Sequence, residues 1–499
     1  MELIGAAGAA SHTALLAPDY PGLTYAQFTA SVMGMVGQLR DFGLGRGDRI
    51  ALVMGNSPEL VQCFFAAATC GTVAPLNPKY TVDDFAFYYG DTHARALITL
   101  PDTVPAAHEA APDAMQIIHA LPQPDGSVRL EQVRGNLPPR AAEPISADDI
   151  AMILHTSGTT SRPKRVPLRH RNMVASARNI AGTYNLSPDD MALCVMPLFH
   201  VHGLMGSMMA TLASGGALVV PSGFSAMEFW KWMRTFSPTW YSAVPTMHQL
   251  LLQRAERNQE TIAAHPFRFI RSSSAPLPPV VLERIESTFN APLLESYGMT
   301  EATHQMASNP LPPAARKAGS VGYGFGVDVA IMDETSSTLL PQGATGEVVV
   351  RGPNVIDGYE QNPEANAKSF VDGWFRTGDQ GHIDADGYLI LTGRLKELIN
   401  RGGEKISPFE IDNLLLRHPA VEQALAFAVP HKMLGEEINA AVVLKPGSDI
   451  SEADLRDYCA ENLAPFKVPR AFHMLEEIPR GATGKLQRLA MARLLNLSE

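Results

Sequence analysis

Apolar and polar residues alternate with two different periods along the first 300 positions of the chain. Residues 24–42 carry apolar side chains at helical spacing behind Thr24, a residue type that caps helix N-termini. Residues 48–56 predict a buried strand, and residues 57–77 a helix followed by another strand. Strands and helices continue to alternate as far as residues 291–298. This rhythm predicts an α/β fold with parallel, doubly wound sheets covered by helices.

The pattern changes after about residue 315. Residues 319–334, 346–359 and 381–394 show short alternating strands with Gly and Asp-Gly turns, which predicts a small β-rich subdomain. A βαβ-like segment of about 100 residues follows, with a boundary near residues 393–396. We therefore expect a large N-terminal domain, residues 1–393, and a small α+β C-terminal domain, residues 394–499.

Composition excludes several classes of function. The 499 residues carry a formal net charge of −11, which argues against broad binding to nucleic acid or to an anionic membrane. The sequence shows no membrane span and no secretory signal, and the expected location is the cytoplasm. The four cysteines lack metal-type spacing, and Cys63 and Cys70 are expected to pack as small apolar side chains. No obligatory protein partner is evident.

The segment TSGTTSRPK, residues 156–164, is dense in hydroxyl groups. It follows a predicted strand at 151–155, lies in a predicted loop at 156–165, and precedes a helix expected to begin near His170. Such a loop can wrap a polyphosphate with N–H and hydroxyl donors, and Lys164 adds positive charge. The Walker A pattern is absent. The alternative is an ordinary solvated loop.

A second motif, LLESYGMTEATHQM, spans residues 293–306. Glu301 follows a predicted strand and a tight Tyr-Gly turn, and its carboxylate could hold Mg²⁺ against phosphates, because Mg²⁺ takes few protein oxygens. Tyr297 could stack on a base. The alternatives are a helix N-terminal acid for Glu301 and a core position for Tyr297.

Three further features lie toward the carboxyl end. Asp379 and Arg394 could bracket a ribose diol, although Asp379 could also belong to a simple hairpin. The segment RGGEKI, residues 401–406, predicts a glycine-lined turn that a thin ligand can approach closely. Lys485 lies in a Gly-rich loop, where most lysines are merely solvated.

Taken in order, the motifs TSGTTSRPK, PLFHVHG, SYGMTE, FRTGD, GRLKELINRGGEKI and PRGATGKLQR resemble the AMP-forming acyl-CoA synthetase, luciferase and adenylation-domain superfamily across residues 150–488. The segments FWKWMRTFSPTWYSAVPTMHQLLL and RFIRSSSAPL are similar, more narrowly, to oxalate–CoA ligases. The resemblance implies a two-step ligation that uses ATP, Mg²⁺ and CoA. A carboxylate attacks the α-phosphate of MgATP to give acyl-AMP and pyrophosphate, and the CoA thiol then displaces AMP.

The resemblance also implies a role for each matching position. Lys485 would bridge the incoming carboxylate and the α-phosphate, Thr300 would contact the α-phosphate, and Glu301 would ligate Mg²⁺. The β- and γ-phosphates would be held by Thr156, Ser157, Gly158, Thr159, Thr160 and Lys164. Ser161 and Arg165 stand where many relatives have glycine, which would place a bulky cation beside the phosphates.

The remaining implied roles concern the nucleoside and CoA. Glu295, Ser296 and Tyr297 would line the adenine site, with Asp379 and Arg394 on the ribose. After adenylation the mobile C-terminal domain would rotate about Lys396 and bring the turn at Gly402 and Gly403 to the site.

The acid pocket is expected to suit a small diacid. Oxalate has no tail to bury, and burying its second carboxylate unpaired would be prohibitive. His202, Ser274 and His304 supply candidate partners, with histidine protonated on binding; the alternative is a pair of structural histidines. Arg271 is another possible anion partner, although a structural salt bridge is equally compatible with its position. Malonate or another short acid fits almost as well, and so does an adenylation enzyme that loads a carrier protein.

Overall fold

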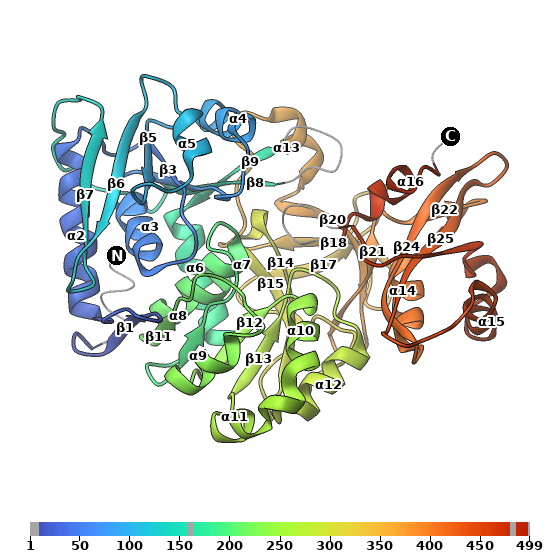
Figure 1. Cartoon of the computed structure of the whole chain (residues 1–499). Helices are drawn as coiled ribbons and strands as arrows, with labels where there is room; N and C mark the ends of the chain where they lie inside the picture. Colours follow the sequence, from blue (N-terminus) through green and yellow to red (C-terminus); the bar gives the residue numbers. More distant parts are fainter. Residues whose placement is uncertain (1–8, 157–162, 480–485, 498–499) are drawn as a thin grey trace.

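The computed structural model describes residues 9–156, 163–479 and 486–497, and its N-terminal part contains two large sheets (Figure 1). The first has the order β7-β6-β5-β3-β4-β8-β9. Its five central strands are parallel and its two edge strands are antiparallel to their neighbours. The strands are β3 (Arg49–Leu52), β4 (Thr72–Pro75), β5 (Ala96–Thr99), β6 (Gln116–Pro122), β7 (Val128–Arg134), β8 (Ile150–Thr156) and β9 (Lys164–Arg169).

The second sheet has the order β16-β15-β14-β13-β12-β10-β11-β1-β2. The strands from β14 to β1 in this order are parallel, so their carboxyl ends share one edge. The strands are β1 (Thr13–Leu16), β2 (Leu23–Thr24), β10 (Met191–Leu193), β11 (Ala217–Val219), β12 (Trp240–Ala243), β13 (Phe269–Ser272), β14 (Leu293–Met299), β15 (His304–Ser308) and β16 (Tyr323–Gly324).

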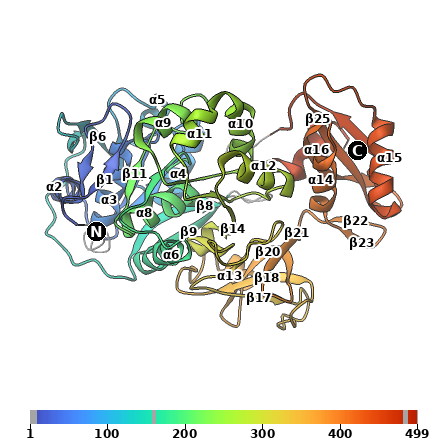
Figure 2. The same ribbon diagram turned by 90° about the horizontal axis from the view of Figure 1, so that it is seen from below.

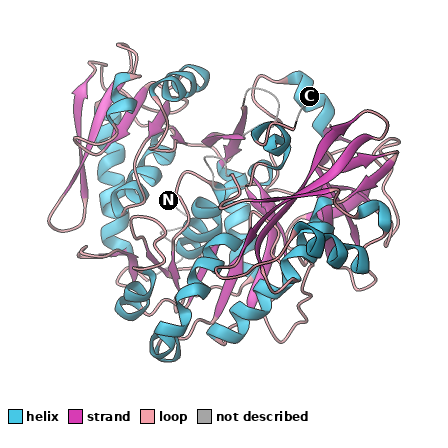
Figure 3. Ribbon diagram, turned by 45° about the vertical axis from the view of Figure 1, so that its right-hand side comes forward, coloured by secondary structure: helices cyan, strands magenta, loops and turns pink. Residues whose placement is uncertain are grey.

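Helices lie beside the strands of both sheets (Figure 3). The first long helix begins after Thr24, whose side chain accepts from the backbone N–H of Gln27 and forms a capping box. The helices are α2 (Tyr25–Asp41), α3 (Pro58–Cys70), α4 (Val82–Thr92), α5 (Pro105–Glu109), α6 (His170–Thr183), α7 (Val201–Gly203), α8 (Ala210–Ala213), α9 (Phe229–Phe236), α10 (Pro245–Ala255), α11 (Gln259–Ala264) and α12 (Pro279–Phe289). The predicted α/β fold with parallel sheets is confirmed.

A smaller antiparallel sheet follows, and Figure 2 shows it beneath the two large sheets. It consists of β17 (Asp328–Met332), β18 (Gly346–Arg351), β19 (Phe370–Val371), β20 (Trp374–Ile383) and β21 (Leu389–Arg394), with α13 (Pro363–Ser369). The last sheet is formed by β22 (Ile399–Arg401), β23 (Glu404–Ile406), β24 (Val421–His431), β25 (Gly435–Leu444) and β26 (Ala471–Met474). It carries α14 (Pro408–Arg417), α15 (Glu452–Asn462) and α16 (Met491–Leu494).

Two local predictions were wrong. The loop expected at 156–165 is shorter, because residues 164–169 form β9 and pair with β8 in a hairpin whose register places Lys164 opposite Thr156. The Tyr-Gly turn expected before Glu301 is strand: Tyr297 and Gly298 belong to β14, at a bulge in its pairing with β15. In both cases pairing with an adjacent strand of the sheet overrides the local signal.

Two other expectations concern burial and membranes. Cys63 and Cys70 are buried on α3, as predicted. Among the residues that the structure describes, no helix combines the length and the apolar character needed to cross a bilayer.

Candidate active site

Tyr297, Asp379 and Arg394 form one polar cluster where β14 meets the small sheet. The Tyr297 hydroxyl donates to Asp379 Oδ2, and Arg394 Nε lies 3.0 Å from Asp379 Oδ1. Asp379 and Arg394 are register partners on β20 and β21. Burial, and next the charge of Asp379, raise the pKa of Tyr297 well above its usual value. The structure therefore joins three side chains that the sequence placed in one nucleotide site.

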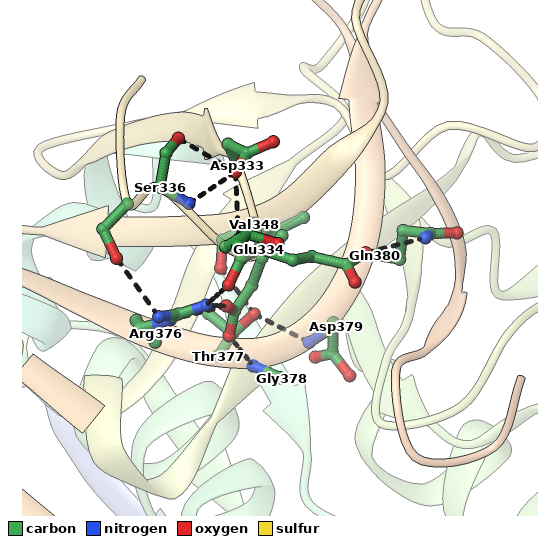
Figure 4. Close-up of polar contacts among 12 residues, drawn as sticks. Asp333, Glu334, Ser336, Val348, Arg376, Thr377, Gly378, Asp379 and Gln380 are labelled. Atoms are coloured by element: carbon green, nitrogen blue, oxygen red, sulfur yellow. Dashed lines mark hydrogen bonds and ion pairs between the residues drawn. The ribbon is translucent and has the colours of Figure 1, made fainter. Parts of the chain in front are cut away.

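The backbone just before Asp379 is fixed by a network of polar contacts (Figure 4). Thr377 Oγ1 donates to the carbonyl of Val348 at 2.7 Å and accepts from the Asp379 backbone N–H at 3.1 Å. The Gly378 N–H donates to Glu347 Oε1 at 2.9 Å, in a backbone conformation with φ of +74°. These bonds hold the Asp379 carboxylate in position without engaging its oxygens.

Lys164, Glu301 and Tyr359 form a second cluster. Tyr359 donates to Glu301 Oε1 at 2.8 Å, and Lys164 Nζ lies 4.4 Å from the centre of the Tyr359 ring. Burial raises the pKa of Glu301, and the Tyr359 hydrogen bond and the Lys164 charge oppose that shift. Thr300 precedes Glu301 in the same short 3-10 helix. Tyr359 was not predicted from the sequence, where its only signal is a tyrosine that follows an Asp-Gly turn.

A single carboxylate suits Mg²⁺ held mainly by phosphates. Across the described parts of the chain, no group of three or more His, Cys, Asp or Glu residues is arranged to hold a metal ion. Glu301 alone would supply one oxygen, and Mg²⁺ bound to a nucleotide takes most of its ligands from phosphate and water. The residues present therefore fit a nucleotide-bound Mg²⁺.

Arg165 does not share the position of Lys164. Neighbouring residues of a strand point to opposite faces, and Arg165 Nη1 donates to the Asp91 carbonyl at 2.5 Å while Nη2 donates to Gln361 Oε1 at 2.8 Å. Its side chain is largely buried there, and Glu360 Oε2 lies 3.6 Å away. Arg165 therefore ties β9 to neighbouring segments, on the face of the strand opposite to Lys164.

Glu295 and Ser296 are both buried on β14. Glu295 Oε1 accepts from the Leu277 N–H at 3.2 Å, while Oε2 has no hydrogen-bond partner among the residues that the structure describes. Burial raises the pKa of Glu295 from 4.5 to about 8. Ser296 Oγ donates to the Ser272 carbonyl at 3.3 Å, which leaves Glu295 as the one of the two with an unused oxygen.

Glu295 should make stability depend on pH. Because its pKa is about 8 when folded and 4.5 in the reference state, the protonated form stabilises the fold below 4.5, and that contribution is lost as the pH rises toward 8. Glu295→Gln should remove this slope of at most about 1.4 kcal/mol per pH unit. Urea unfolding at pH 5 and pH 8 measures it. Equal pH dependence in both proteins would contradict the assignment.

His202, Ser274 and His304 meet at the carboxyl edge of the second large sheet. His202 Nδ1 lies 3.0 Å from Ser274 Oγ, and Nε2 lies 2.6 Å from Ser242 Oγ on β12. The His202 and His304 rings stack with centres 5.2 Å apart. Burial, and next the Arg271 charge, hold the pKa of His304 well below 6.5. The lowered pKa favours the neutral form of the His304 ring.

Two residues of this cluster, Ser274 and His304, have a strained backbone conformation. Ser274 has φ of +73° and His304 has φ of +95°, a region that non-glycine residues rarely adopt and that costs about 1–3 kcal/mol per residue. Gly206 lies on a π-helix, residues 204–209, and a Cβ there would come within 2.6 Å of His304 Nε2. His304 therefore packs closely against the π-helix at Gly206. Gly206 and Ser242 were not predicted from the sequence.

Five of the predicted site residues are not described by the structure, and four others lie outside the clusters above. Ser157, Gly158, Thr159, Thr160 and Lys485 lie outside the described residues. Thr156 ends β8, and Lys396 lies between β21 and β22. Gly402 and Gly403 form the turn between β22 and β23 with φ of +62° and +95°, as predicted for a glycine-lined turn.

Comparison with known families agrees with this arrangement. The family model described as "AMP-binding enzyme" matches residues 5–360, and the model described as "AMP-binding enzyme C-terminal domain" matches residues 410–485. The chain belongs to the AMP-binding enzyme family, and the expected membership of the adenylate-forming superfamily is confirmed.

The chain is similar to characterised ligases along nearly its whole length. It is 46% identical over 463 residues to an oxalate–CoA ligase of Arabidopsis thaliana, covering 91% of this chain and 89% of that one. It is 42% identical to an oxalate–CoA ligase of Saccharomyces cerevisiae, covering 90% and 87%. The ATP-bound crystal structure of MatB from Rhodopseudomonas palustris superposes with a TM-score of 0.88 at 29% identity, covering 99% and 97%.

Proposed function

We propose that this protein ligates oxalate to CoA in an ATP-dependent, AMP-forming reaction. The observation that carries the proposal is the identity of 46% and 42% to two oxalate–CoA ligases, over 91% and 90% of this chain. The cluster of His202, Ser274 and His304 supports a small acid, because its identified polar groups are hydroxyls and imidazoles. A long apolar acid would find few partners there.

The nucleotide would be held by the two clusters described above. Asp379 and Arg394 are assigned to the ribose, Glu295, Ser296 and Tyr297 to the adenine, and Thr300 to the α-phosphate. Lys164 and the segment from Thr156 to Thr160 are assigned to the β- and γ-phosphates. Glu301 would hold Mg²⁺, which neutralises phosphate charge when bound. Lys164 thus places a positive charge beside the phosphates, and the Asp379 carboxylate can accept from the ribose hydroxyls.

In the first half-reaction, an oxygen of the substrate carboxylate bonds to the α-phosphorus, and the bond to the bridging oxygen of pyrophosphate breaks. Lys485 is assigned to the charge that develops on the α-phosphate. In the second, the CoA sulfur replaces AMP at the acyl carbon. We assign residues 1–393 to the nucleotide and acid sites and residues 394–499 to a mobile domain that turns about Lys396 and presents Gly402 and Gly403 to CoA. His202, Ser274 and His304 are assigned to the acid.

The test is pyrophosphate release with ATP, Mg²⁺ and CoA over oxalate, malonate, succinate, acetate, octanoate and coumarate. We expect turnover with oxalate at least ten times that with any other acid, together with oxalyl-CoA formation. A preference for malonate would retain the ligase chemistry but reject this substrate. Pyrophosphate release that continues only when a carrier protein replaces CoA would favour a carrier-loading enzyme instead.

A further inference from the structure

Arg271 is a fully buried guanidinium without an acidic partner. It lies on β13 with 0% of its surface exposed, and no carboxylate within the described residues forms an ion pair with it. We infer that Arg271 is a specificity-determining positioning residue, whose charge, acting through His304, selects acids that carry a second negative group. This inference rests on the proposed function and names the residue behind its substrate preference.

All the hydrogen bonds that Arg271 donates through its side chain end on neutral groups. Nε donates to the Tyr184 hydroxyl at 2.8 Å and Nη1 donates to Ser242 Oγ at 3.0 Å. Nη2 donates to His304 Nε2 at 2.9 Å and to Gln305 Oε1 at 3.2 Å. These contacts engage four of the five N–H groups but leave the positive charge without a negative partner among the described residues.

A buried, unpaired charge is costly, and most buried arginines therefore sit beside an acid. The nearby Arg268 shows the ordinary arrangement, since its Nε lies 2.8 Å from Asp190 Oδ1. Arg271 is buried despite this energetic cost, although no acidic side chain among the described residues pairs with it. An anion that enters the adjoining pocket would supply the missing charge, and a dicarboxylate retains one negative charge there after its other carboxylate has reacted.

Arg271 also fixes what His304 can offer to a ligand. Because Nη2 donates to His304 Nε2, that nitrogen accepts, and the neutral ring carries its proton on Nδ1. The imidazole thus presents an N–H on the side away from Arg271. Gly206 packs against the same pair, with a would-be Cβ 2.6 Å from His304 Nε2 and 3.1 Å from Arg271 Nη1, so neither side chain can shift toward the π-helix.

The position of Arg271 in the sheet explains why its partners converge. Ser242 on β12 is its register partner, and Leu294 on β14 is its partner on the other side. His304 begins β15, and His202 reaches Ser242 from α7. Four elements therefore meet around one guanidinium, directly behind the two histidines assigned to the acid.

The experiment compares Arg271→Gln and Arg271→Lys with a control, Arg268→Gln, which removes a partly exposed arginine three positions earlier. Pyrophosphate release is measured with oxalate and with glycolate, the two-carbon acid in which a hydroxymethyl group replaces one carboxylate. For Arg271→Gln we expect KM for oxalate to rise on the order of 10²-fold, since losing one partner of a buried charge interaction has effects of this size. The KM values for ATP and for glycolate should change less than threefold.

Arg271→Lys retains the charge without the planar fork, and it should recover at least a tenth of the lost oxalate kcat/KM. A merely structural role would instead weaken oxalate, glycolate and ATP together, and that result would overturn the inference. An unchanged oxalate KM in Arg271→Gln would overturn it as well.

If the wild-type protein does not use oxalate, the proposed function fails separately. The same variants are then assayed with the acid that it does use, and an unchanged preference for dianionic over monoanionic acids would overturn the inference too.

Discussion

Asp379→Asn is expected to lower kcat/KM for ATP by about 10²- to 10⁴-fold while the protein stays folded. The substitution preserves the shape of the side chain but removes the negative charge that faces Arg394. It also replaces one of the two carboxylate oxygens, which accept from Tyr297 and pair with Arg394, by an amide NH2 group. A ribose diol held by a carboxylate gains two charge-assisted hydrogen bonds, each worth about 1.5–3 kcal/mol. Each 1.4 kcal/mol corresponds to about a factor of ten, which sets the expected range.

Asp328→Asn is a matched control in the same sheet. Asp328 on β17 is the register partner of Arg351 on β18, at an exposed position where the ion-pair distance is 3.1 Å. Such an exposed pair contributes little, and the control should keep ATP kinetics within twofold of the wild type. The discriminating measurement uses 3′-deoxy-ATP: the wild type should prefer ATP strongly, and Asp379→Asn should lose most of that preference. If the variant discriminates as well as the wild type, the diol is held elsewhere.

The sequence predicted the elements that local signals determine. Thr24 caps α2 and the buried segments 49–52 and 72–75 are strands, because capping chemistry and apolar runs act over a few residues. Strand β9 was missed because its residues, KRVPLR, carry three cations and a proline, and only pairing with β8 makes them a strand. Edge strands tolerate such residues, which is why the local signal is weak.

The site residues show the same difference between what the sequence predicts and what depends on strand pairing. The resemblance to the adenylate-forming superfamily placed Asp379, Arg394 and Tyr297 in one nucleotide site, and the structure joins them. The sequence could not show that Arg271 lacks an acid, because an ion pair depends on which strands become neighbours. It also could not show that Arg165 points away from Lys164, since that follows from the hairpin register that places both on one strand.

His304→Ala is expected to lower kcat/KM for oxalate by about 10²- to 10³-fold and to leave KM for ATP unchanged. The substitution removes the Nδ1–H that can meet a carboxylate, a hydrogen bond to a charged group worth about 1.5–3 kcal/mol. It also leaves Arg271 Nη2 without one of its acceptors, and an unsatisfied buried donor costs about 1–3 kcal/mol. Both losses fall on the acid pocket, and neither touches the residues assigned to the nucleotide.

His248→Ala is the control for emptying a buried histidine position. His248 is fully buried on α10, and its Nδ1 lies 3.1 Å from the Tyr241 hydroxyl; burial lowers its pKa to about 3. If both variants lose oxalate activity equally, the effect is structural. His304→Asn should retain more activity than His304→Ala, since asparagine tolerates a φ of +95° better and its amide N–H can replace Nδ1–H.

The pH profile separates a neutral from a protonated His304. The pKa of His304 lies well below 6.5, so the ring stays neutral from pH 6 to 8 and should add no change in kcat/KM for oxalate over that range. A histidine that must be protonated would instead make kcat/KM fall as the pH rises through 6.5. A fall that is present in the wild type and absent in His304→Asn would assign the positive charge to His304. A flat profile in both proteins assigns that charge to Arg271.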